Sequence, residues 1–538
     1  MKPKIIYEDI SPLAKIDSSE YTSTDKKDYV NMSDLKSEKP TYYPNYALCL
    51  PRYSKIGEYN NSPDAMPESG LGYVSESISG EKRTFTSNPI IERVFSQKHS
   101  SVGVCIGFNQ YSGDYCDLVN IKWYEDSTLL YDKDFEPNST YYFCQQNVAN
   151  FNKLIIEFKR TSKSYRYAWV GTIDYGVVRE FNNDEAKNIN TLNEISQISE
   201  ELTINTMNFK LFSLTDVEFM FQKTQVMKLY ADDQLMGAYY IDVAKRTASN
   251  QYDIKTKDAI GIMAEINYMG GMYDNVLASA IITDIFSRCN LEYELDETLS
   301  SKTITGYMPI MTCRDTLTWI CMAIGGVVNT AYSEKVVIKP IQTQIKRNIS
   351  AHEQFVGASI ETLAKVTGVS VQGYKYTTSS ESVELFNDTL SDTITVQFSE
   401  PIHSLSITNG EILESNVNYA VITGKGATVL SGKRYNVSTI LSTKLNPSLG
   451  SLELQNIVEL KNVNIINSAN IVEVRDRIYD YYLNNKQINV KLVVGENKLG
   501  DKVNIDTVYE GTKTGIIEKM STTYTNSIAS EVVIRWVL

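Results

Sequence analysis

Three aromatic residues alternate along one predicted strand and form the part of the sequence best suited to binding a ligand. Tyr165, Tyr167 and Trp169 are each separated by one residue in the segment SYRYAWVG. In a β-strand this spacing places all three rings on one face. On an exposed face the rings could stack on a sugar, whereas on an inward face they would pack against a second sheet or a neighbouring subunit. Both interpretations remain open from the sequence.

The histidines do not form a recognisable catalytic or metal-binding motif. The chain has three, His99, His352 and His403, and none lies within helical reach of another histidine, a cysteine or a pair of acidic ligands. The dipeptide His352-Glu353 lacks the second histidine of the H-E-x-x-H zinc motif. We therefore expect no catalytic residue, no metal site and no cofactor.

Paired carboxylates are the remaining route to catalysis, because glycoside hydrolysis needs two of them on either side of the bond that is cut. Asp296 with Glu297, or Asp114 with Asp117, could meet other acids in the folded chain. Acidic residues are so common here that such pairs are uninformative. A cell-wall hydrolase is therefore only the third of three functional hypotheses, and we expect the protein not to be an enzyme.

Composition limits the partners and the compartment. A formal net charge of −13 argues against nucleic acid, whose binding requires neutralisation of phosphates by basic side chains. The chain has no apolar run long enough to span a membrane and no signal-peptide core. Seven cysteines without a C-x-x-C pair indicate reduced thiols, with a bridge among Cys105, Cys116 and Cys144 as the alternative. We expect a protein that is made and assembled in the bacterial cytoplasm.

Length and aromatic content favour several domains rich in β-sheet. A chain of 538 residues corresponds to three or four domains at about 100–200 residues each. Its 36 tyrosines outnumber the 16 phenylalanines and 4 tryptophans, a bias suited to half-solvated sheet surfaces and interfaces. The predicted fold class is α+β and mostly β, with few helices.

The segment 274–341 is where the local signals for secondary structure agree best. A helix is predicted over 274–289, with apolar residues at helical spacing and Asn290 suited to end it. A second helix is predicted to begin after Thr312, whose hydroxyl can accept a hydrogen bond from the first turn, and to end at Gly325-Gly326. Two short strands follow. The predicted order is helix, strand, strand, helix and a strand pair.

This order, with a Gly-x-x-Pro before the capped helix and a lysine that bounds the last strand, resembles the tail-hub domain of phage baseplate proteins. Such hubs also occur in contractile phage-tail-like bacteriocins and in the tail-tip proteins of phages that infect Gram-positive bacteria. The residues that carry the resemblance are Ile304, Gly306, Pro309, Arg314, Asp315, Leu317, Ala323, Gly325 and Lys339, followed near the C-terminus by Gly515, Ile516, Glu518 and Met520.

The first part of the chain divides into three predicted regions. Residues 1–82 lack periodicity and contain several prolines, so they are expected to form an extended arm that lies on another surface, with disorder as the alternative. Residues 83–176 contain short apolar runs at strand spacing and are predicted to form a β-sandwich. Their closing strands, FNKLIIEFKRTSKSYRYAWVGTIDYG, resemble those of galactose-binding-like jelly rolls, a fold shared with carbohydrate-binding modules. The polar stretch 177–202 is predicted to be a linker with a short helix.

The second part is predicted to contain the hub. Residues 203–345 form its α+β domain, and residues 455–538 return to it with a helix capped by Ser468 and three strands. Between them, residues 346–454 have short strands but few helical signals, with turns at 408–410 and 423–426. We predict that this region is a β-rich inserted domain.

The resemblance implies a structural subunit of a phage tail or phage-tail-like bacteriocin baseplate, located in the virion or particle. Such a subunit forms the hub or tail-tip ring and connects the tail tube to peripheral baseplate proteins. It is expected to be a homo-oligomer of three or six copies. The alternative is a carbohydrate-binding receptor or adhesin of the same particle, with cell-wall glycan as its partner and Tyr165, Tyr167 and Trp169 as its site.

Overall fold

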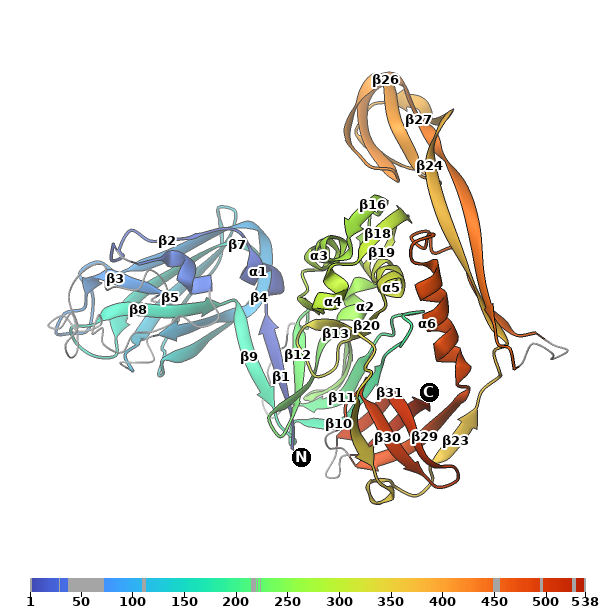
Figure 1. The fold of residues 1–538 in the computed structure, drawn as a ribbon. Helices are drawn as coiled ribbons and strands as arrows, with labels where there is room; N and C mark the ends of the chain where they lie inside the picture. Colours follow the sequence, from blue (N-terminus) through green and yellow to red (C-terminus); the bar gives the residue numbers. More distant parts are fainter. Residues whose placement is uncertain are drawn as a thin grey trace, which may run out of the picture. The chain divides into compact units, whose positions relative to one another are not determined.

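The computed structural model describes residues 2–28, 30–36, 72–108, 113–213, 219, 221–222, 224–448, 455–493, 497–524 and 529–536. It is mostly β, with several sheets and few helices, and this confirms the predicted fold class (Figure 1). Two compact units are present. The N-terminal unit comprises Ile6–Phe181 and Ser213–Met227, and the larger unit comprises Met1–Ile5, Asn182–Phe212 and Lys228–Leu538.

A seven-stranded sheet of β2 to β8 forms the centre of the N-terminal unit. The elements of this unit are β1 (Pro3–Ile10), α1 (Pro12–Ile16), β2 (Tyr21–Thr22), the 3-10 helix η1 (Met32–Lys36), β3 (Tyr73–Ile78), β4 (Ile90–Phe108), β5 (Cys116–Glu125), β6 (Thr128–Phe135), β7 (Tyr141–Thr161), β8 (Tyr167–Asp174) and β9 (Gly176–Phe181). The strand order is β3-β8-β4-β7-β5-β6, and β2 pairs with β4. Its core contains Trp123, Phe151 and Phe158.

The sandwich predicted from short strands differs from this sheet in a specific way. Several of the predicted strands are parts of β4 and β7, which are 19 and 21 residues long. The pairing of these two strands is interrupted by bulges between Val94 and Gly103. A bulge takes up one extra residue and bends the strand without ending it, so the sequence pattern breaks while the strand continues. Hydrogen bonding therefore joins the predicted short strands into one continuous sheet.

Part of the segment 1–82, which is predicted to form an extended arm, packs into a hydrophobic core. Ala14, Tyr21, Leu35 and Tyr73 are all buried in the core of the N-terminal unit. The segment therefore contributes side chains to that core, although its own periodicity is too weak to predict this. The aromatic and leucine residues that suggested a sticky arm, Tyr42, Tyr43, Tyr46, Leu48, Leu50 and Tyr53, lie outside the described residues.

The short helix predicted within the linker at 177–202 is wrong. The segment contains the strands β9 and β10 (Ala186–Glu194) and no helix. In β10 the side chains of Ile189, Thr191 and Asn193 point inward, while lysine and asparagine occupy outward positions. A strand that is paired on both sides does not need an apolar sequence, because its neighbours satisfy its backbone hydrogen bonds. Polar composition therefore hid the strand.

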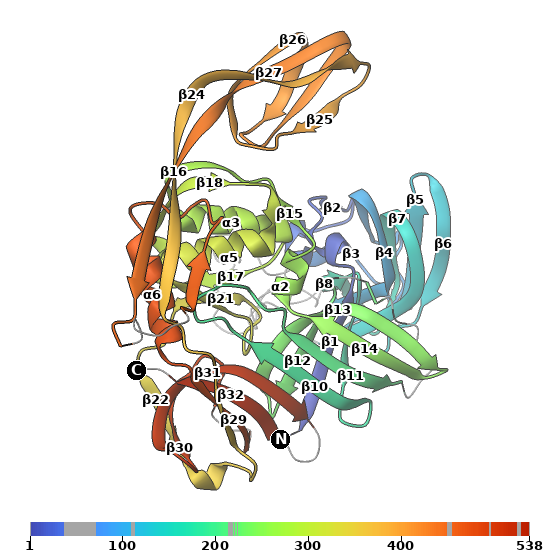
Figure 2. The same ribbon diagram turned by 90° about the vertical axis from the view of Figure 1, so that its right-hand side faces the viewer.

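The larger unit is organised around a wide sheet made from two distant parts of the chain (Figures 1 and 2). Within this unit the strand order of the sheet is β23-β29-β32-β31-β10-β11-β14-β13-β12. Off this path, β30 pairs with both β31 and β22. The strands are β10, β11 (Thr206–Phe212), β12 (Val226–Ala231), β13 (Gln234–Ala248), β14 (Gln251–Lys257), β22 (Ile345–Ile349), β23 (Ser359–Thr362), β29 (Lys486–Val493), β30 (Lys502–Thr507), β31 (Gly511–Tyr524) and β32 (Ala529–Trp536), with the 3-10 helix η3 (Ala351–Glu353) between β22 and β23. The junction is the antiparallel pairing of β10 with β31.

In the sequence, an α/β layer comes between these two parts of the chain. Its elements are α2 (Ala259–Met263), β15 (Asn267–Tyr268), β16 (Gly271–Leu277), α3 (Ala278–Cys289), β17 (Tyr293–Leu295), α4 (Glu297–Ser300), β18 (Thr303–Met308), β19 (Met311–Thr312), α5 (Cys313–Ile324), β20 (Gly326–Asn329) and β21 (Val336–Pro340). Thr312 accepts a hydrogen bond from the backbone N–H of Asp315, and Gly325 ends α5 in the left-handed conformation, as predicted. Helix α3 begins later than predicted, because the residues before it pair with β18.

The inserted β-rich region is a long hairpin arm. It consists of β24 (Gly368–Leu390), β25 (Ile394–Gln397), β26 (Ile402–Ser415), β27 (Tyr419–Leu445) and β28 (Ile457–Leu460), and a small core near its tip includes Leu390, Ile422 and Leu430 (Figure 2). The turns predicted at 408–410 and 423–426 are wrong, because Gly410 and Gly424 face each other within the paired strands.

Two predicted boundaries near the arm also change. The insertion was expected from residue 346, but β22 and β23 pair with β30 and β29 of the C-terminal part. The last helix, α6 (Ile471–Leu483), begins after Asn470 and receives no side-chain cap from Ser468. Its buried face, with Val474 and Ile478, shares a core with the α/β layer. Residues 463–536 therefore pack with the part of the chain that precedes the arm.

Candidate functional site

The aromatic strip predicted from sequence does not form a common exposed platform. Tyr165 is 46% exposed and has a φ of 56° in the turn before β8, so it is not part of the strand. Tyr167 is the first residue of β8, and the Lys27 ammonium lies 4.7 Å from its ring centre. Trp169 is only 4% exposed and belongs to the core of the N-terminal unit. The expectation of one face failed because the alternation begins at Tyr167.

The candidate catalytic carboxylates are engaged in ion pairs. Asp114 accepts a hydrogen bond from Arg166 at 3.0 Å. Asp117 accepts one from Arg83 at 2.6 Å and one from Arg160 at 2.7 Å. Carboxylate oxygens that accept hydrogen bonds from guanidinium groups are already occupied by structural contacts. These aspartates connect the strands of the sheet to neighbouring turns. Asp296 likewise caps α4 by accepting a hydrogen bond from the backbone of Thr298.

The histidines are separated from one another in the fold. His99 is buried beside Asp17, with its Nε2 3.0 Å from the carboxylate. His352 lies in η3, and His403 contacts the backbone carbonyl of Arg434. Across the residues that the structure describes, no group of three His, Cys, Asp or Glu side chains could hold a metal ion. No helix in the same ranges is long and apolar enough to cross a membrane.

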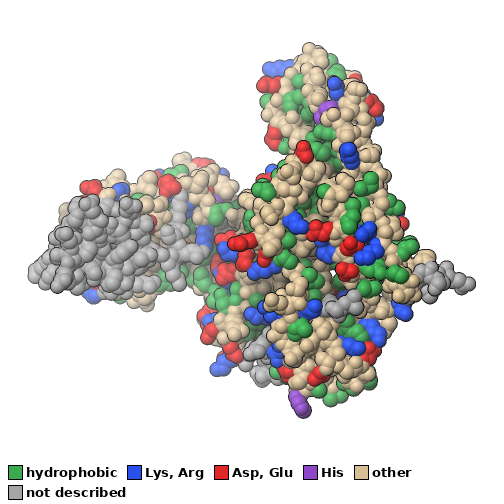
Figure 3. Space-filling model, viewed as in Figure 1, with side chains coloured by type: hydrophobic (Ala, Val, Ile, Leu, Met, Phe, Trp, Pro, Cys, Tyr) green, Lys and Arg blue, Asp and Glu red, His purple; other side chains and the backbone are tan. Residues whose placement is uncertain are grey.

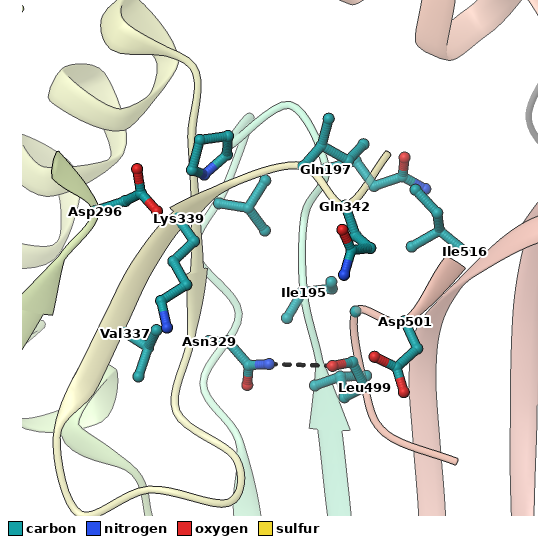
Figure 4. A pocket seen from close by; sticks show the side chains of 14 residues that line it. Ile195, Gln197, Asp296, Asn329, Val337, Lys339, Gln342, Leu499, Asp501 and Ile516 are labelled. Atoms are coloured by element: carbon teal, nitrogen blue, oxygen red, sulfur yellow. Dashed lines mark hydrogen bonds between the residues drawn. The ribbon is translucent and has the colours of Figure 1, made fainter. Parts of the chain in front are cut away.

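The candidate functional site is a cavity of about 370 Å³ in the larger unit (Figure 4). It lies between the β20–β21 hairpin, the chain that leaves β10 and the loop before β30. The residues that line it are Ile195, Gln197, Asp296, Val327, Asn329, Val337, Lys339, Pro340, Ile341, Gln342, Leu499, Gly500, Asp501 and Ile516. Apolar side chains and primary amides are thus mixed in its wall.

Two charged groups face the cavity from opposite sides. Figure 4 shows Lys339 on one side and Asp501 on the other, with Gln342 between them. Lys339 is held by an ion pair of 2.8 Å with Glu294. Burial raises the pKa of Asp501, whose carboxylate accepts a hydrogen bond from the backbone of Lys498. The wall, which also includes Asp296, thus offers one cation, two anions and amides.

The arrangement offers hydrogen-bonding groups that suit a polar chain. The Asn329 amide donates to the carbonyl of Leu499 at 3.2 Å, which holds the hairpin on the loop (Figure 4). Gln197 and Gln342 add further amides, and a primary amide can both donate to and accept from a peptide backbone. The lining contains no nucleophile beside a general base, which acyl transfer and related reactions require.

A partly buried acid, Glu518, lies behind this cavity. The Gln197 amide donates to its Oε1 at 2.8 Å, so the same side chain lines the cavity and contacts the acid. Glu518 occupies a bulge in the pairing of β31 with β32. Burial raises its pKa to about 7, although the nearby Arg535 guanidinium and hydrogen bonds from Gln197 and Tyr481 lower it in part. The carboxyl therefore changes charge near neutral pH at a junction of three elements.

Glu518→Gln should change how stability depends on pH. The folded-state pKa is above the ordinary value of 4.5, so the folded protein binds the proton more tightly. This contribution is fully present below about pH 4.5 and is lost as the pH rises through about 7. Glutamine mimics the protonated acid. We expect the variant to match wild type at pH 5 and to be more stable by about 1–3 kcal/mol at pH 8.

Urea titrations at pH 5, 6, 7 and 8 measure this difference, with Glu531→Gln on an exposed position of β32 as the matched control. Subtracting the variant from wild type removes the effect of Asp258, whose pKa burial raises to about 6 in the same direction. A constant offset between wild type and Glu518→Gln across the four pH values would contradict the assignment.

Sequence reasoning found little of this site. Lys339 and Glu518 appeared only as positions that resemble the tail-hub pattern, and the amides carried no signal. Amide side chains are common on surfaces, so only their convergence in the fold marks them. The cysteines, in contrast, met expectation: the six within the described residues are free and buried, and burial raises the pKa of Cys105 to about 12, which keeps it unreactive.

No protein-family model and no curated protein matches the chain. Among solved structures, similarity extends to the 43 kDa tail protein of prophage MuSo2 from Shewanella oneidensis, with 7% identity, a TM-score of 0.43 and coverage of 66% of this chain and 95% of that one. The tail protein from Neisseria meningitidis MC58 has 7% identity and a TM-score of 0.44, with coverage of 66% and 93%. Prophage tail protein gp18 from Listeria monocytogenes EGD-e has 12% identity and a TM-score of 0.38, with coverage of 66% and 91%.

Proposed function

We propose that this chain is a structural subunit of a phage tail or phage-tail-like bacteriocin baseplate and forms its hub or tail-tip ring. It works by assembly and not by catalysis, and its neighbours are the tail tube and other baseplate proteins. The observation that carries the proposal is the composite larger unit. The two stretches that resemble tail hubs, 203–345 and 455–538, pack into shared cores on either side of the arm.

Exposed apolar loop tips support an assembling protein. Strands β22 and β30 are parallel, so the loop after β22 and the turn after β30 leave the same end of the sheet. The loop carries Val356, which is fully exposed. The turn carries Val508 and Tyr509, which are 74% and 73% exposed. Large apolar side chains at one end of a domain are typical of surfaces that a partner covers.

The charge on the surface gives no support to a nucleic-acid partner. Figure 3 shows acidic and basic side chains interspersed on the viewed face of the larger unit, without a continuous basic stripe. Together with the net charge of −13, this favours protein neighbours, since nucleic-acid binding needs clustered cations.

The test is the assembly state of the full-length chain. Mass photometry of the purified protein, alone and with the tail-tube protein of the same particle, should detect rings of three or six copies. Val356→Lys combined with Tyr509→Lys should prevent ring formation or tube binding, because burying two ammonium groups in an apolar interface is costly. The matched control is Leu413→Lys, at an apolar residue that is 53% exposed and lies on the arm.

A protein that stays monomeric at micromolar concentration and does not bind the tube would overturn the proposal. Equal assembly of the loop-tip variant and the Leu413→Lys control would instead exclude this end of the sheet as the interface. Electron microscopy of the parent particle, with the chain located in the density, provides the independent check.

A further inference from the structure

A second cavity in the larger unit, of about 270 Å³, is lined mostly by uncharged polar side chains and tyrosines, together with three apolar residues and one lysine. It lies where β10, β31 and β32 meet the start of β13 and the turn between β20 and β21. The residues that line it are Asn193, Gln234, Leu235, Met236, Tyr332, Asn497, Lys498, Met520, Thr522, Tyr524 and Ser530.

The floor of this cavity is one polar face of the sheet. Asn193 pairs with Met520 across β10 and β31, and Thr522 pairs with Ser530 across β31 and β32, so their side chains share a face. Tyr524 lies on the same face, two residues beyond Thr522. Apart from Met520, these are polar residues at positions that are normally apolar in a sheet interior.

These polar side chains are buried and bonded within the protein, whereas one polar atom of the adjoining wall has no partner among the described residues. The Thr522 and Ser530 hydroxyls bond each other at 2.6 Å, and Asn193 accepts from Tyr239 at 3.0 Å. Asn497 is 6% exposed, and its Oδ1 has no partner among the described residues. An unpaired buried carbonyl costs free energy unless water or a ligand supplies a donor.

The remaining wall adds an aromatic surface and an open side. The Tyr332 ring belongs to the wall, and the Lys498 ammonium lies 5.6 Å from its centre. Gln234 and Lys498 are exposed, so the cavity opens between them. Lys498 is the only charged residue of the lining. A charged ligand would need more opposite charge than this wall supplies.

From these features we infer that this cavity binds a single neutral sugar unit. Amides and hydroxyls can each donate and accept, which matches the alternating demands of neighbouring sugar hydroxyls, and the C–H face of a sugar ring packs on a tyrosine. The volume is below the range of about 300–1,000 Å³ typical of drug-sized ligands, so one ring fits better than a chain. The site is separate from the aromatic strip of the N-terminal unit.

Sugar binding at this cavity is a property beyond assembly, and the experiment can exclude it without excluding the assembly function. The experiment is saturation-transfer NMR of the full-length protein with glucose, galactose, rhamnose, N-acetylglucosamine and N-acetylgalactosamine, with glycerol as a small polyol. At least one sugar should bind with a Kd of about 1 mM, as expected for about twelve non-hydrogen atoms, and glycerol should bind at least tenfold more weakly.

Two variants and one matched control locate the binding. Gln234→Trp fills the opening from an exposed position and should abolish the signal without affecting the fold. Thr522→Val keeps the side-chain shape but removes a hydroxyl, and should weaken binding about tenfold. Thr523→Val is the control, because Thr523 lies on the opposite face of β31 and bonds Asn190, so its affinity should change less than about twofold.

Three results would overturn the inference. The first is no sugar signal at about 50 mM, far above the expected Kd. The second is equal binding of glycerol and the sugars, which would indicate a cavity filled by any small polyol or by water. The third is binding that survives Gln234→Trp, which would place the sugar elsewhere. If Thr522→Val does not fold, the Gln234→Trp result decides alone.

Discussion

Replacing Arg93 by alanine should destabilise the N-terminal unit by about 3–5 kcal/mol, because it leaves buried acceptors without a donor. Arg93 is 1% exposed. Its guanidinium donates to the carbonyl of Ala14 at 3.2 Å, to the carbonyl of Asp17 at 2.9 Å and to the Tyr175 hydroxyl at 3.2 Å. These bonds hold residues 11–22 on β4.

Aromatic rings complete the environment of this guanidinium. Its central carbon lies 4.6 Å from the ring centre of Phe95, 4.8 Å from that of Tyr21 and 5.3 Å from that of Tyr175. A planar guanidinium can stack on rings while its edge donates hydrogen bonds, whereas an ammonium cannot do both. We therefore expect Arg93→Lys to recover less than half of the lost stability.

Hydrogen exchange measured by mass spectrometry on the full-length chain reads out this effect locally. The backbone of residues 11–22 should lose its protection in Arg93→Ala, while the larger unit keeps its own. Arg83→Ala is the control, because its ion pair with Asp117 is partly exposed and should be worth less than about 1 kcal/mol. Equal effects of the two variants would contradict the structural role of Arg93.

The second large effect is expected at Trp169. Its removal by alanine should cost about 3–5 kcal/mol, because it leaves a cavity in the core of the N-terminal unit. Trp169 pairs with Val74 of β3, so the cavity would lie on the face of a hydrogen-bonded sheet that cannot collapse into it without breaking its hydrogen bonds. Trp169→Phe should cost less, since it keeps most of the apolar volume.

Thermal melts of Trp169→Ala and Tyr165→Ala, run beside a pull-down on Gram-positive cell walls, separate packing from sugar binding. Tyr165 is exposed, so its loss should change stability by less than about 0.5 kcal/mol. If Trp169→Ala instead kept the wild-type melting temperature and lost binding to the walls, the ring would be a sugar platform and its burial in the core would be wrong.

The sequence predicted features that neighbouring residues determine better than features that depend on contacts between distant segments. The spacing of Tyr165, Tyr167 and Trp169 drew attention to them, and the burial of Trp169 was one of the two alternatives that this spacing allowed. The choice between them depends on which distant segments pack against the face of β8 that carries Trp169, and this core draws on residues from Ala14 to Tyr175. The sequence of β8 carries no signal about which of its faces these segments will cover.

Where a few neighbouring residues decide the conformation, the sequence alone was sufficient. Thr312 and Asp315 define the start of α5 because capping needs only a hydroxyl and a backbone N–H three residues away. Asn290 and Gly325 end their helices because both residue types accept the left-handed conformation at low cost. Net charge and aromatic content are likewise properties of the chain that folding does not change.

Only the tertiary structure determined the features that join distant segments. The polar strand β10 exists because β11 and β31 pair with it, and β22 joins the C-terminal sheet through β30. The carboxyl of Glu518 and the carbonyl of Asn497 acquire their properties from burial by residues more than a hundred positions away as well as by neighbours. Burial and desolvation depend on the whole packed surroundings of a group, and a local sequence pattern does not contain that information.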